Sequence, residues 1–174
     1  RSLAHAAART ESTPRGLLVE LNKLLTPDLK RGFFVSAACA SIDPRTGEAT
    51  LASAGSRAPM LQFVSAAAGI RAVQPDGIAL GLDKGPVFER SLQEAHLTLA
   101  PGDALVLATE GAFQLLGSDG KPLGDVSFRK LALAEAKSGL DGLAGRIVAA
   151  VEARLAPDPG AFDMTVVTAV RVAG

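Results

Sequence analysis

The chain has no tryptophan and no tyrosine, and its aromatic residues are seven phenylalanines among 174 residues. Stacking platforms for nucleic-acid bases or for sugars are therefore not expected. Lysine plus arginine number 18 and so do aspartate plus glutamate, so the net charge gives no electrostatic footprint for a nucleic acid or an anionic membrane. No apolar run is long enough to span a membrane, and the alanine-rich start lacks the charged-then-apolar order of a signal peptide.

Cysteine and histidine are also scarce. The single cysteine, Cys39, cannot form an internal disulfide; we interpret it as a small buried hydrophobe, and we expect a reducing, cytoplasmic location. His5 and His96 are isolated, and His96 alternates outward on an expected strand, as a surface residue would. Because Ser36 and Ser56 have no histidine partner nearby in the sequence, a serine nucleophile is not expected. Glycine-rich phosphate loops and paired cysteine or histidine metal motifs are absent from the sequence.

The amino-acid composition is typical of a globular protein. Hydrophobic residues make up 48% and charged residues 21%, and the length suits one domain with its own core. Apolar periodicity, bounded by proline, glycine, threonine and aspartate, predicts where helices and strands lie. We expect helices over 1–9, 14–25, 125–137 and 140–155, and strands over 33–42, 48–53, 60–64, 70–73, 87–99, 104–108 and 164–172.

One strand is expected to organise the others. Ala104–Ala108 is a near-continuous apolar run, which is typical of a strand buried on both faces. The tight turn Pro101–Asp103 precedes it and predicts a hairpin with a long strand over Val87–Leu99. The apolar run ends at Thr109–Gly111, so this strand carries Glu110 to the end of a sheet, where a carboxylate is well placed to bind a cation.

Hairpins and helices are segregated along the sequence. A turn at Asp43–Gly47 joins two expected strands, and a second hairpin joins Met60–Val64 to Ile70–Val73. The last two helices follow these hairpins instead of alternating with strands. The pattern predicts an α+β fold with layered antiparallel sheets and argues against a doubly wound nucleotide-binding fold.

Six short segments, spread over nearly the whole chain, are similar to known sequence motifs. The segments and the motifs are Leu21–Leu25 (L-N-x-L-L), Phe33–Gly47 (F-V-T-A followed by D-x-x-T-G), Ala54–Pro59 (A-G-H-x-P-P), Ala79–Leu82 (P-L-G-L), Leu99–Asp103 with Thr109–Gly111 (L-x-P-G-D, then T-D-G), and Phe162–Thr165 (D-D-x-T). In this order, the segments resemble the SpoIIE/RsbU branch of metal-dependent (PPM-type) protein serine/threonine phosphatases.

The resemblance implies a four-layer α-β-β-α sandwich of two antiparallel sheets flanked by helices, formed by one domain over residues 1–174. In such enzymes aspartates hold two manganese or magnesium ions, which activate a water for attack on a phosphoryl group. Typical substrates are phosphoserine or phosphothreonine on anti-sigma-antagonist (STAS) proteins in stress and sporulation signalling, and we expect a fusion to an upstream sensor domain. The family's N-terminal metal-binding segment, with its D-x-S-G-H-G motif, is missing from these residues.

Three further positions depart from the family pattern. The metal-binding Asp of T-D-G is replaced by Glu110, which is one methylene longer, and the first Asp of D-D-x-T is replaced by Phe162. The His of A-G-H-x-P-P is replaced by Ser56. Glu110 and Asp163 remain as candidate metal ligands in a degenerate site. The candidate site-lining residues are Thr109, Gly111, Ser56 and Phe162.

These departures leave three hypotheses for the function. The first is a catalytically degenerate phosphatase domain, a pseudophosphatase that binds a partner or regulates it and holds no metal. The second is a fragment of an active manganese- or magnesium-dependent phosphatase in which Glu110 is a variant ligand. The third is an unrelated α+β binding domain.

Overall fold

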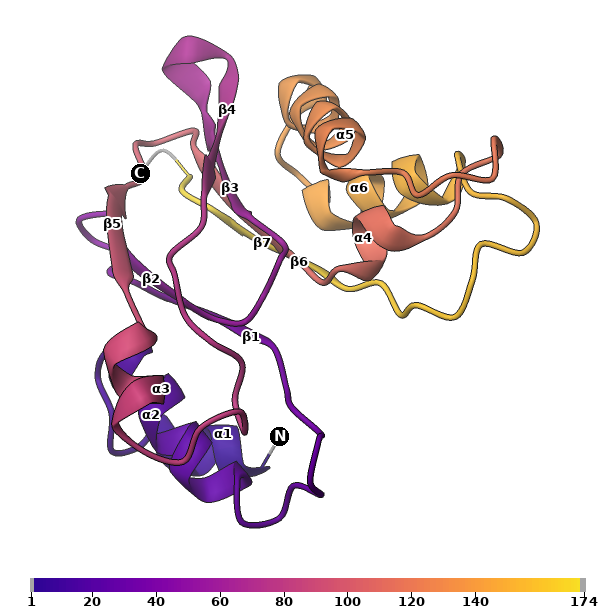
Figure 1. Cartoon of the computed structure of the whole chain (residues 1–174). Helices are drawn as coiled ribbons and strands as arrows, with labels where there is room; N and C mark the ends of the chain where they lie inside the picture. The colour runs from indigo at the N-terminus through magenta and orange to yellow at the C-terminus, as the bar shows by residue number, and fades with distance from the viewer. Residues whose placement is uncertain (1, 173–174) are drawn as a thin grey trace. The chain divides into compact units, whose positions relative to one another are not determined.

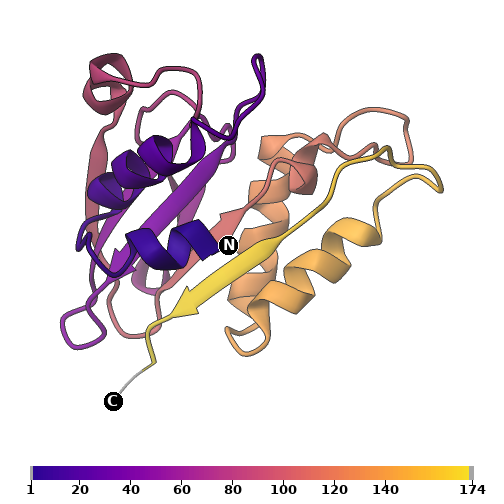
Figure 2. The same cartoon turned by 90° about the horizontal axis from the view of Figure 1, so that it is seen from below.

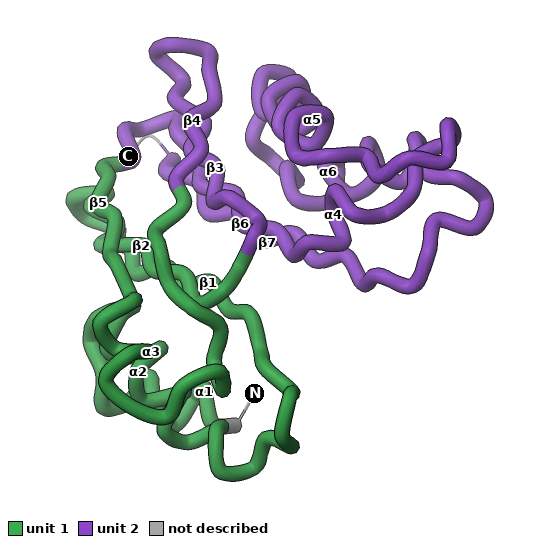
Figure 3. Tube along the Cα trace, viewed as in Figure 1, with its two compact units in different colours: residues 1–56, 74–98 green, residues 57–73, 99–174 purple. Residues whose placement is uncertain are grey.

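The computed structural model describes residues 2–172, and its chain divides into two compact units. Unit 1 comprises residues 1–56 and 74–98, and unit 2 comprises residues 57–73 and 99–174 (Figures 1 and 3). The predicted helix over 1–9 is observed as α1, Ser2–Ala7, and Arg1 lies outside the described residues.

Unit 1 is a three-stranded antiparallel sheet in the order β1-β2-β5, with three helices. Its elements are α1, α2 (Pro14–Leu25), β1 (Ala37–Ile42), β2 (Glu48–Ala54), α3 (Pro86–Ser91) and β5 (Glu94–Thr98). The helix α2 begins where the sequence predicts, because the Thr13 side chain accepts a hydrogen bond from the Gly16 N–H at 3.0 Å. Its apolar side, including Leu18 and Leu21, is buried against Ala52 and Ala54 of β2.

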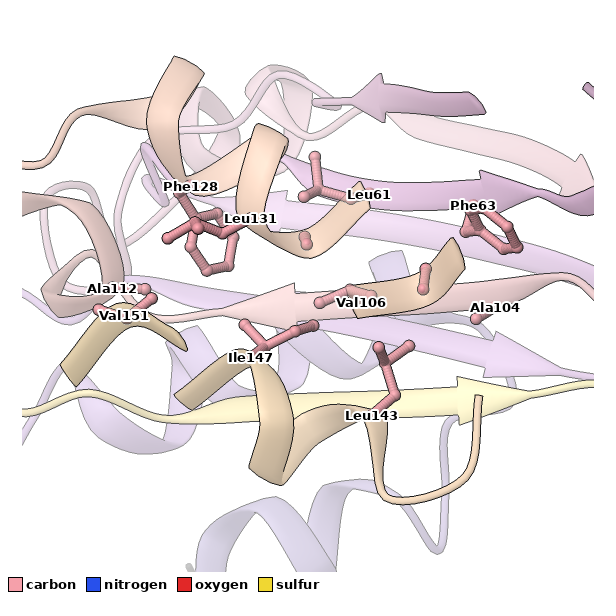
Figure 4. Packing of buried hydrophobic residues seen from close by; sticks show 12 residues of the cluster. Leu61, Phe63, Ala104, Val106, Ala112, Phe128, Leu131, Leu143, Ile147 and Val151 are labelled. Carbon is pink, nitrogen blue, oxygen red and sulfur yellow. The ribbon is translucent and has the colours of Figure 1, made fainter. Parts of the chain in front are cut away.

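Unit 2 is a four-stranded antiparallel sheet in the order β4-β3-β6-β7. Its elements are β3 (Met60–Val64), the short 3-10 turn η1 (Ser65–Ala67), β4 (Gly69–Val73), β6 (Ala104–Ala108), α4 (Gly111–Gln114), α5 (Asp125–Ser138), α6 (Leu143–Glu152) and β7 (Val166–Val170). The helices α5 and α6 pack on one face of this sheet (Figure 2). Phe128 and Ile147 from the helices lie against Leu61 and Val106 from the strands (Figure 4).

A buried carboxylate fixes the turn that leads into β6. Asp103 is 2% exposed; its Oδ1 accepts hydrogen bonds from the Ser65 N–H at 2.9 Å and hydroxyl at 3.0 Å, and its Oδ2 accepts one from the Ala100 N–H at 3.0 Å. Burial raises the pKa of Asp103, but these hydrogen bonds outweigh it, so the pKa lies below its ordinary value. The aspartate of the L-x-P-G-D segment therefore has a structural role, joining the turn before β6 to the end of β3.

A buried amide joins two other motif segments within unit 1. Asn22, on α2, is 2% exposed. Its Nδ2 donates to the Asp83 carbonyl and its Oδ1 accepts from the Gly81 N–H, both at 2.8 Å. The Leu21–Leu25 segment thereby holds the loop that follows Ala79–Leu82, which accounts structurally for both segments.

The predicted long strand over Val87–Leu99 is wrong. Residues Pro86–Ser91 form the helix α3, and β5 covers only Glu94–Thr98. Pro86 sets a helical φ at the first position, and the Asp83 carboxylate accepts hydrogen bonds from the Gly85 and Phe88 N–H groups at 3.0 Å each. The predicted hairpin with β6 is also wrong, because β5 pairs with β2 and β6 pairs with β3 and β7.

The predicted buried strand over Phe33–Ile42 is only partly correct. The strand β1 begins at Ala37, and Phe33 and Phe34 are 65% and 59% exposed. Only one bridge, between Val35 and Leu80, extends toward the predicted start. In contrast, the hairpin turn at Asp43–Gly47 and the β3–β4 hairpin are confirmed.

Candidate functional site

The candidate site lies where the end of β6 meets the start of β7. These strands are antiparallel with Ala108 opposite Val166, so the segments that follow β6 and precede β7 emerge at the same edge of the unit 2 sheet. The Thr109 N–H donates to the Thr165 carbonyl at 3.0 Å, and the Thr165 N–H donates to the Thr109 hydroxyl oxygen at 2.9 Å. The Thr109 hydroxyl in turn donates to the Asp163 carbonyl at 3.2 Å. The structure thus brings the two predicted ligand segments together.

The Glu110 carboxylate already has two protein partners. Glu110 is half-buried and lies at the start of the short helix α4. Its Oε1 accepts a hydrogen bond from the Arg57 N–H at 3.2 Å, and its Oε2 accepts one from the Gln114 side-chain amide at 2.6 Å. Each carboxylate oxygen therefore accepts one hydrogen bond from a neutral N–H donor of the protein.

Gly111 permits a close approach between the two segments. A Cβ at this position would lie 2.2 Å from the Asp163 carbonyl oxygen, a separation that nonbonded atoms do not tolerate. Gly111 is buried, whereas Asp163 and Phe162 are exposed, the ring to 51%. Asp163 therefore contributes its backbone carbonyl to this contact, and Phe162 presents a ring where the family pattern has a carboxylate.

The described residues do not by themselves supply the ligands of a two-ion centre. A dinuclear site needs several oxygen ligands that converge on each ion. Within residues 2–172, no group of three or more His, Cys, Asp or Glu side chains is arranged to hold a metal ion. Glu110 is engaged by Arg57 and Gln114, and Phe162 offers no oxygen.

Ser56 belongs to unit 1, unlike the other predicted site residues. Its carbonyl oxygen accepts a hydrogen bond from the Gln74 side-chain amide at 3.4 Å. Sequence reasoning did not identify Arg57 or Gln114 as neighbours of Glu110. For Gln114 a signal was available, because it lies four residues after Glu110, the spacing at which side chains meet on a helix. The Arg57 contact is made by its backbone N–H. Because every residue except proline has this group, the residue type gives no signal of the contact.

The sequence was compared with models of known protein families and with curated proteins. The sequence model of the family described as Stage II sporulation protein E (SpoIIE) matches residues 1–172. No curated protein sequence matches the chain at a significant level.

No helix within residues 2–172 combines the length and the apolar character needed to cross a membrane.

Three solved structures are similar in fold. The SiaA-PP2C domain of Pseudomonas aeruginosa is 20% identical with a TM-score of 0.76, and the match covers 97% of this chain and 66% of that one. The RsbU and RsbW domains of a Mycobacterium tuberculosis protein are 21% identical with a TM-score of 0.73, and the match covers 96% of this chain and 44% of that one. The phosphatase domain of the cell fate determinant SpoIIE from Bacillus subtilis, presoaked with manganese, is 16% identical with a TM-score of 0.64. That match covers 99% of this chain and 72% of the other.

The chain therefore spans less than two thirds of the first two structures that it matches. The likeness confirms the predicted α+β class, with two antiparallel sheets and flanking helices, as the fold of PP2C-type phosphatase domains. The match of the family sequence model over residues 1–172 shows that the chain belongs to the SpoIIE family.

Proposed function

We propose that this SpoIIE-family domain is catalytically degenerate and acts by binding or regulating a protein partner. The observation that carries the proposal is the state of the Glu110 carboxylate, whose two oxygens accept hydrogen bonds from the Arg57 N–H and the Gln114 amide. To bind a cation with both oxygens, Glu110 would have to give up these two bonds. Among residues 2–172, Asp163 is the other carboxylate predicted from the sequence for this edge of the sheet. These residues alone would leave a pair of divalent ions without most of its ligands.

The geometry that remains suits recognition more than hydrolysis. Hydrogen bonds from Thr109 to Asp163 and between Thr109 and Thr165 hold the two segments of this edge together without a partner. An exposed ring at Phe162 supplies apolar contact area of the kind that is enriched in protein interfaces. We propose a phosphoprotein or a STAS-type anti-sigma antagonist as the partner, in the cytoplasm, with an upstream sensor domain in the longer protein.

Phosphate release tests this proposal directly. The chain is incubated with a phosphoserine-bearing STAS domain and with para-nitrophenyl phosphate, each with manganese or magnesium. We expect no release above the metal-only blank, and we expect the phosphorylated STAS domain to bind the chain in a pull-down. Turnover that requires manganese and disappears in Glu110→Gln would contradict the proposal, because the substitution keeps the side-chain shape and removes the charge.

A second function is favoured by the placement of Glu110 and Asp163 at one edge of the sheet. In this alternative, the chain is part of an active manganese- or magnesium-dependent phosphoserine/phosphothreonine phosphatase, and a longer protein supplies the remaining carboxylates. The matched SiaA domain and the matched RsbU–RsbW protein are longer than the regions that this chain covers, which leaves room for such a segment.

The alternative predicts a different result for a longer protein. If residues that precede Arg1 in a longer protein carry the D-x-S-G-H-G motif, that protein should release phosphate, and Glu110→Ala within it should abolish the release. An inactive longer protein that carries the motif favours the degenerate domain. A longer protein whose activity survives Glu110→Ala contradicts Glu110 as a ligand.

A further inference from the structure

Two separate contacts join the chain around α4 to the chain that connects α6 with β7. We call residues 109–118 the α4 segment and residues 153–165 the α6–β7 connection. At the candidate site, Thr109 exchanges hydrogen bonds with Thr165, and its hydroxyl donates to the Asp163 carbonyl. This first contact therefore lies directly before α4.

The second contact lies beyond the other end of α4. The Leu116 N–H donates to the Pro159 carbonyl and the Ala156 N–H donates to the Leu116 carbonyl, both at 2.9 Å. Beside them, the Ser118 N–H donates to the Arg154 carbonyl at 3.0 Å. Since these bonds reach the same connection as the first contact, one continuous stretch of chain holds α4 at both ends.

The second contact is continuous with the last turn of α6. The Arg154 N–H donates to the Val151 carbonyl at 2.9 Å, and the Leu155 N–H donates to the Glu152 carbonyl at 3.1 Å. The residue that accepts the Ser118 hydrogen bond thus also extends the hydrogen bonding of α6. A displacement of this end of α6 therefore acts directly on the α4 segment.

Few buried side chains fasten the α4 segment and the α6–β7 connection to the rest of unit 2. The described residues 152–165 include no buried one. In the α4 segment, Ala112 is a buried member of the core cluster around Phe128, and Phe113 packs against that cluster. In contrast, Ala104–Val106 of β6 are fully buried. Segments with few buried apolar contacts open at a lower free energy than the core strands beside them.

We propose that the α4 segment and the α6–β7 connection open as one cooperative unit, and that this unit couples the end of α6 to the candidate site. Glu110 lies between the two contacts, so opening of the unit breaks its hydrogen bond to the Arg57 N–H. A domain or partner that displaces the end of α6 thereby changes the bonding of Glu110 without contacting that residue. The coupling is independent of whether the domain hydrolyses phosphate.

Amide hydrogen exchange of the 174-residue chain, followed by NMR at low urea concentrations, tests the proposal. We expect the Thr109 and Thr165 amides of the first contact to share one opening free energy and one urea dependence with the Leu116 and Ala156 amides of the second. The amides of β6 should exchange more slowly. Different opening free energies at the two contacts, or exchange of both only together with β6, would overturn the proposal.

A proline variant tests whether the two contacts are coupled. Ala156→Pro removes the N–H that donates to Leu116, and it should speed exchange at Thr109 and Thr165, at the far end of α4, by about five-fold. The matched control is Ala161→Pro in the same connection. Because the Ala161 N–H has no hydrogen-bond partner among the described residues, this variant should leave exchange at those two amides unchanged.

Urea denaturation establishes whether each variant is folded. Faster exchange at Thr109 and Thr165 in Ala156→Pro alone supports the coupling. Unchanged exchange at these amides in a folded Ala156→Pro, or an equal acceleration in Ala161→Pro, overturns it. If Ala156→Pro does not fold, the comparison of opening free energies in the wild-type chain decides, and different values at the two contacts overturn the proposal.

Discussion

The side-chain amide of Gln114 donates a 2.6 Å hydrogen bond to Glu110 Oε2, across one turn of α4. Glu110 occupies the position at which the family pattern has a metal-binding aspartate. The Glu110 side chain, which is one methylene longer, meets a donor one turn further along its own helix. In this structure, the carboxylate at that position is therefore hydrogen-bonded to the protein itself.

The Glu110 contacts should contribute modestly to stability. Glu110→Ala removes the acceptors of the Arg57 N–H and the Gln114 amide, and we expect the free energy of unfolding to fall by about 1 kcal/mol. Glu110→Gln keeps one oxygen acceptor and should lose less. Urea denaturation of the two variants and the wild type measures this difference, and an alanine variant as stable as the wild type would show that the carboxylate is not held as described.

Gly111→Ala should separate the two segments of the candidate site. The new Cβ would lie 2.2 Å from the Asp163 carbonyl oxygen, so one of the two backbones must move. We expect destabilisation of about 2 kcal/mol or more, with faster hydrogen exchange at the Thr109 and Thr165 amides. The control is Gly145→Ala in α6, where a Cβ meets no atom within 4 Å, and which should leave stability unchanged or raise it. Equal behaviour of both variants contradicts the close approach at Gly111.

Asp103 should make stability depend on pH in the acid range. Burial raises its pKa, but the hydrogen bonds from Ser65 and Ala100 bring the net pKa below the ordinary value of 3.8. The folded state therefore binds the proton less readily than the unfolded chain. Its stabilising contribution is complete above the ordinary pKa and is lost as the pH falls through the lowered one.

Asp103→Asn should therefore cost stability near neutral pH and cost less in acid. We expect a loss of about 2 kcal/mol at neutral pH, because the amide replaces a charged acceptor by a donor facing N–H groups. Ser65→Ala, which removes one of the donors, should cost about 1 kcal/mol. Unfolding by urea at a series of pH values provides the measurement. A difference between wild type and Asp103→Asn that does not shrink with falling pH would count against the assignment.

Asn22 should be intolerant of substitution although it touches no candidate site residue. Asn22→Ala leaves the Asp83 carbonyl and the Gly81 N–H without their side-chain partner, and we expect a loss of about 2 kcal/mol. Lys23→Ala, at the exposed neighbouring position, should change stability by less than about 0.5 kcal/mol. Chemical denaturation compares the two variants, and similar losses in both would contradict the role given to Asn22.

Local signals predicted much of the fold. Thr13 before Pro14 marks the start of α2, and the Asp43–Gly47 turn marks the first hairpin, because in each case neighbouring residues supply the hydrogen bonds. The apolar run Ala104–Ala108 correctly predicted a central strand, although its pairing partners were wrong. Local patterns cannot specify pairing, because a strand's partner depends on residues far away in the sequence.

The errors have identifiable causes. The alternation at Leu97 and Leu99 is typical of a strand, but the predicted strand extended too far toward Val87. Asp83 and Pro86 start a helix there, and that capping pattern was not recognised. Phe33 and Phe34 are apolar and were expected to be buried, yet exposure depends on what packs against them. At the candidate site, Glu110 and Asp163 as metal ligands stay a prediction from the sequence, while the Arg57 contact depends on a backbone group that only the folded chain positions.

Manganese binding by the 174-residue chain tests the central proposal most directly. The electron paramagnetic resonance signal of free aqueous Mn²⁺ is recorded while the chain is titrated into it, because bound Mn²⁺ loses that sharp signal. We predict that the signal persists at an excess of protein and that Glu110→Gln gives the same trace. Loss of the signal corresponding to two ions per chain, reversed by Glu110→Gln, would contradict a degenerate site.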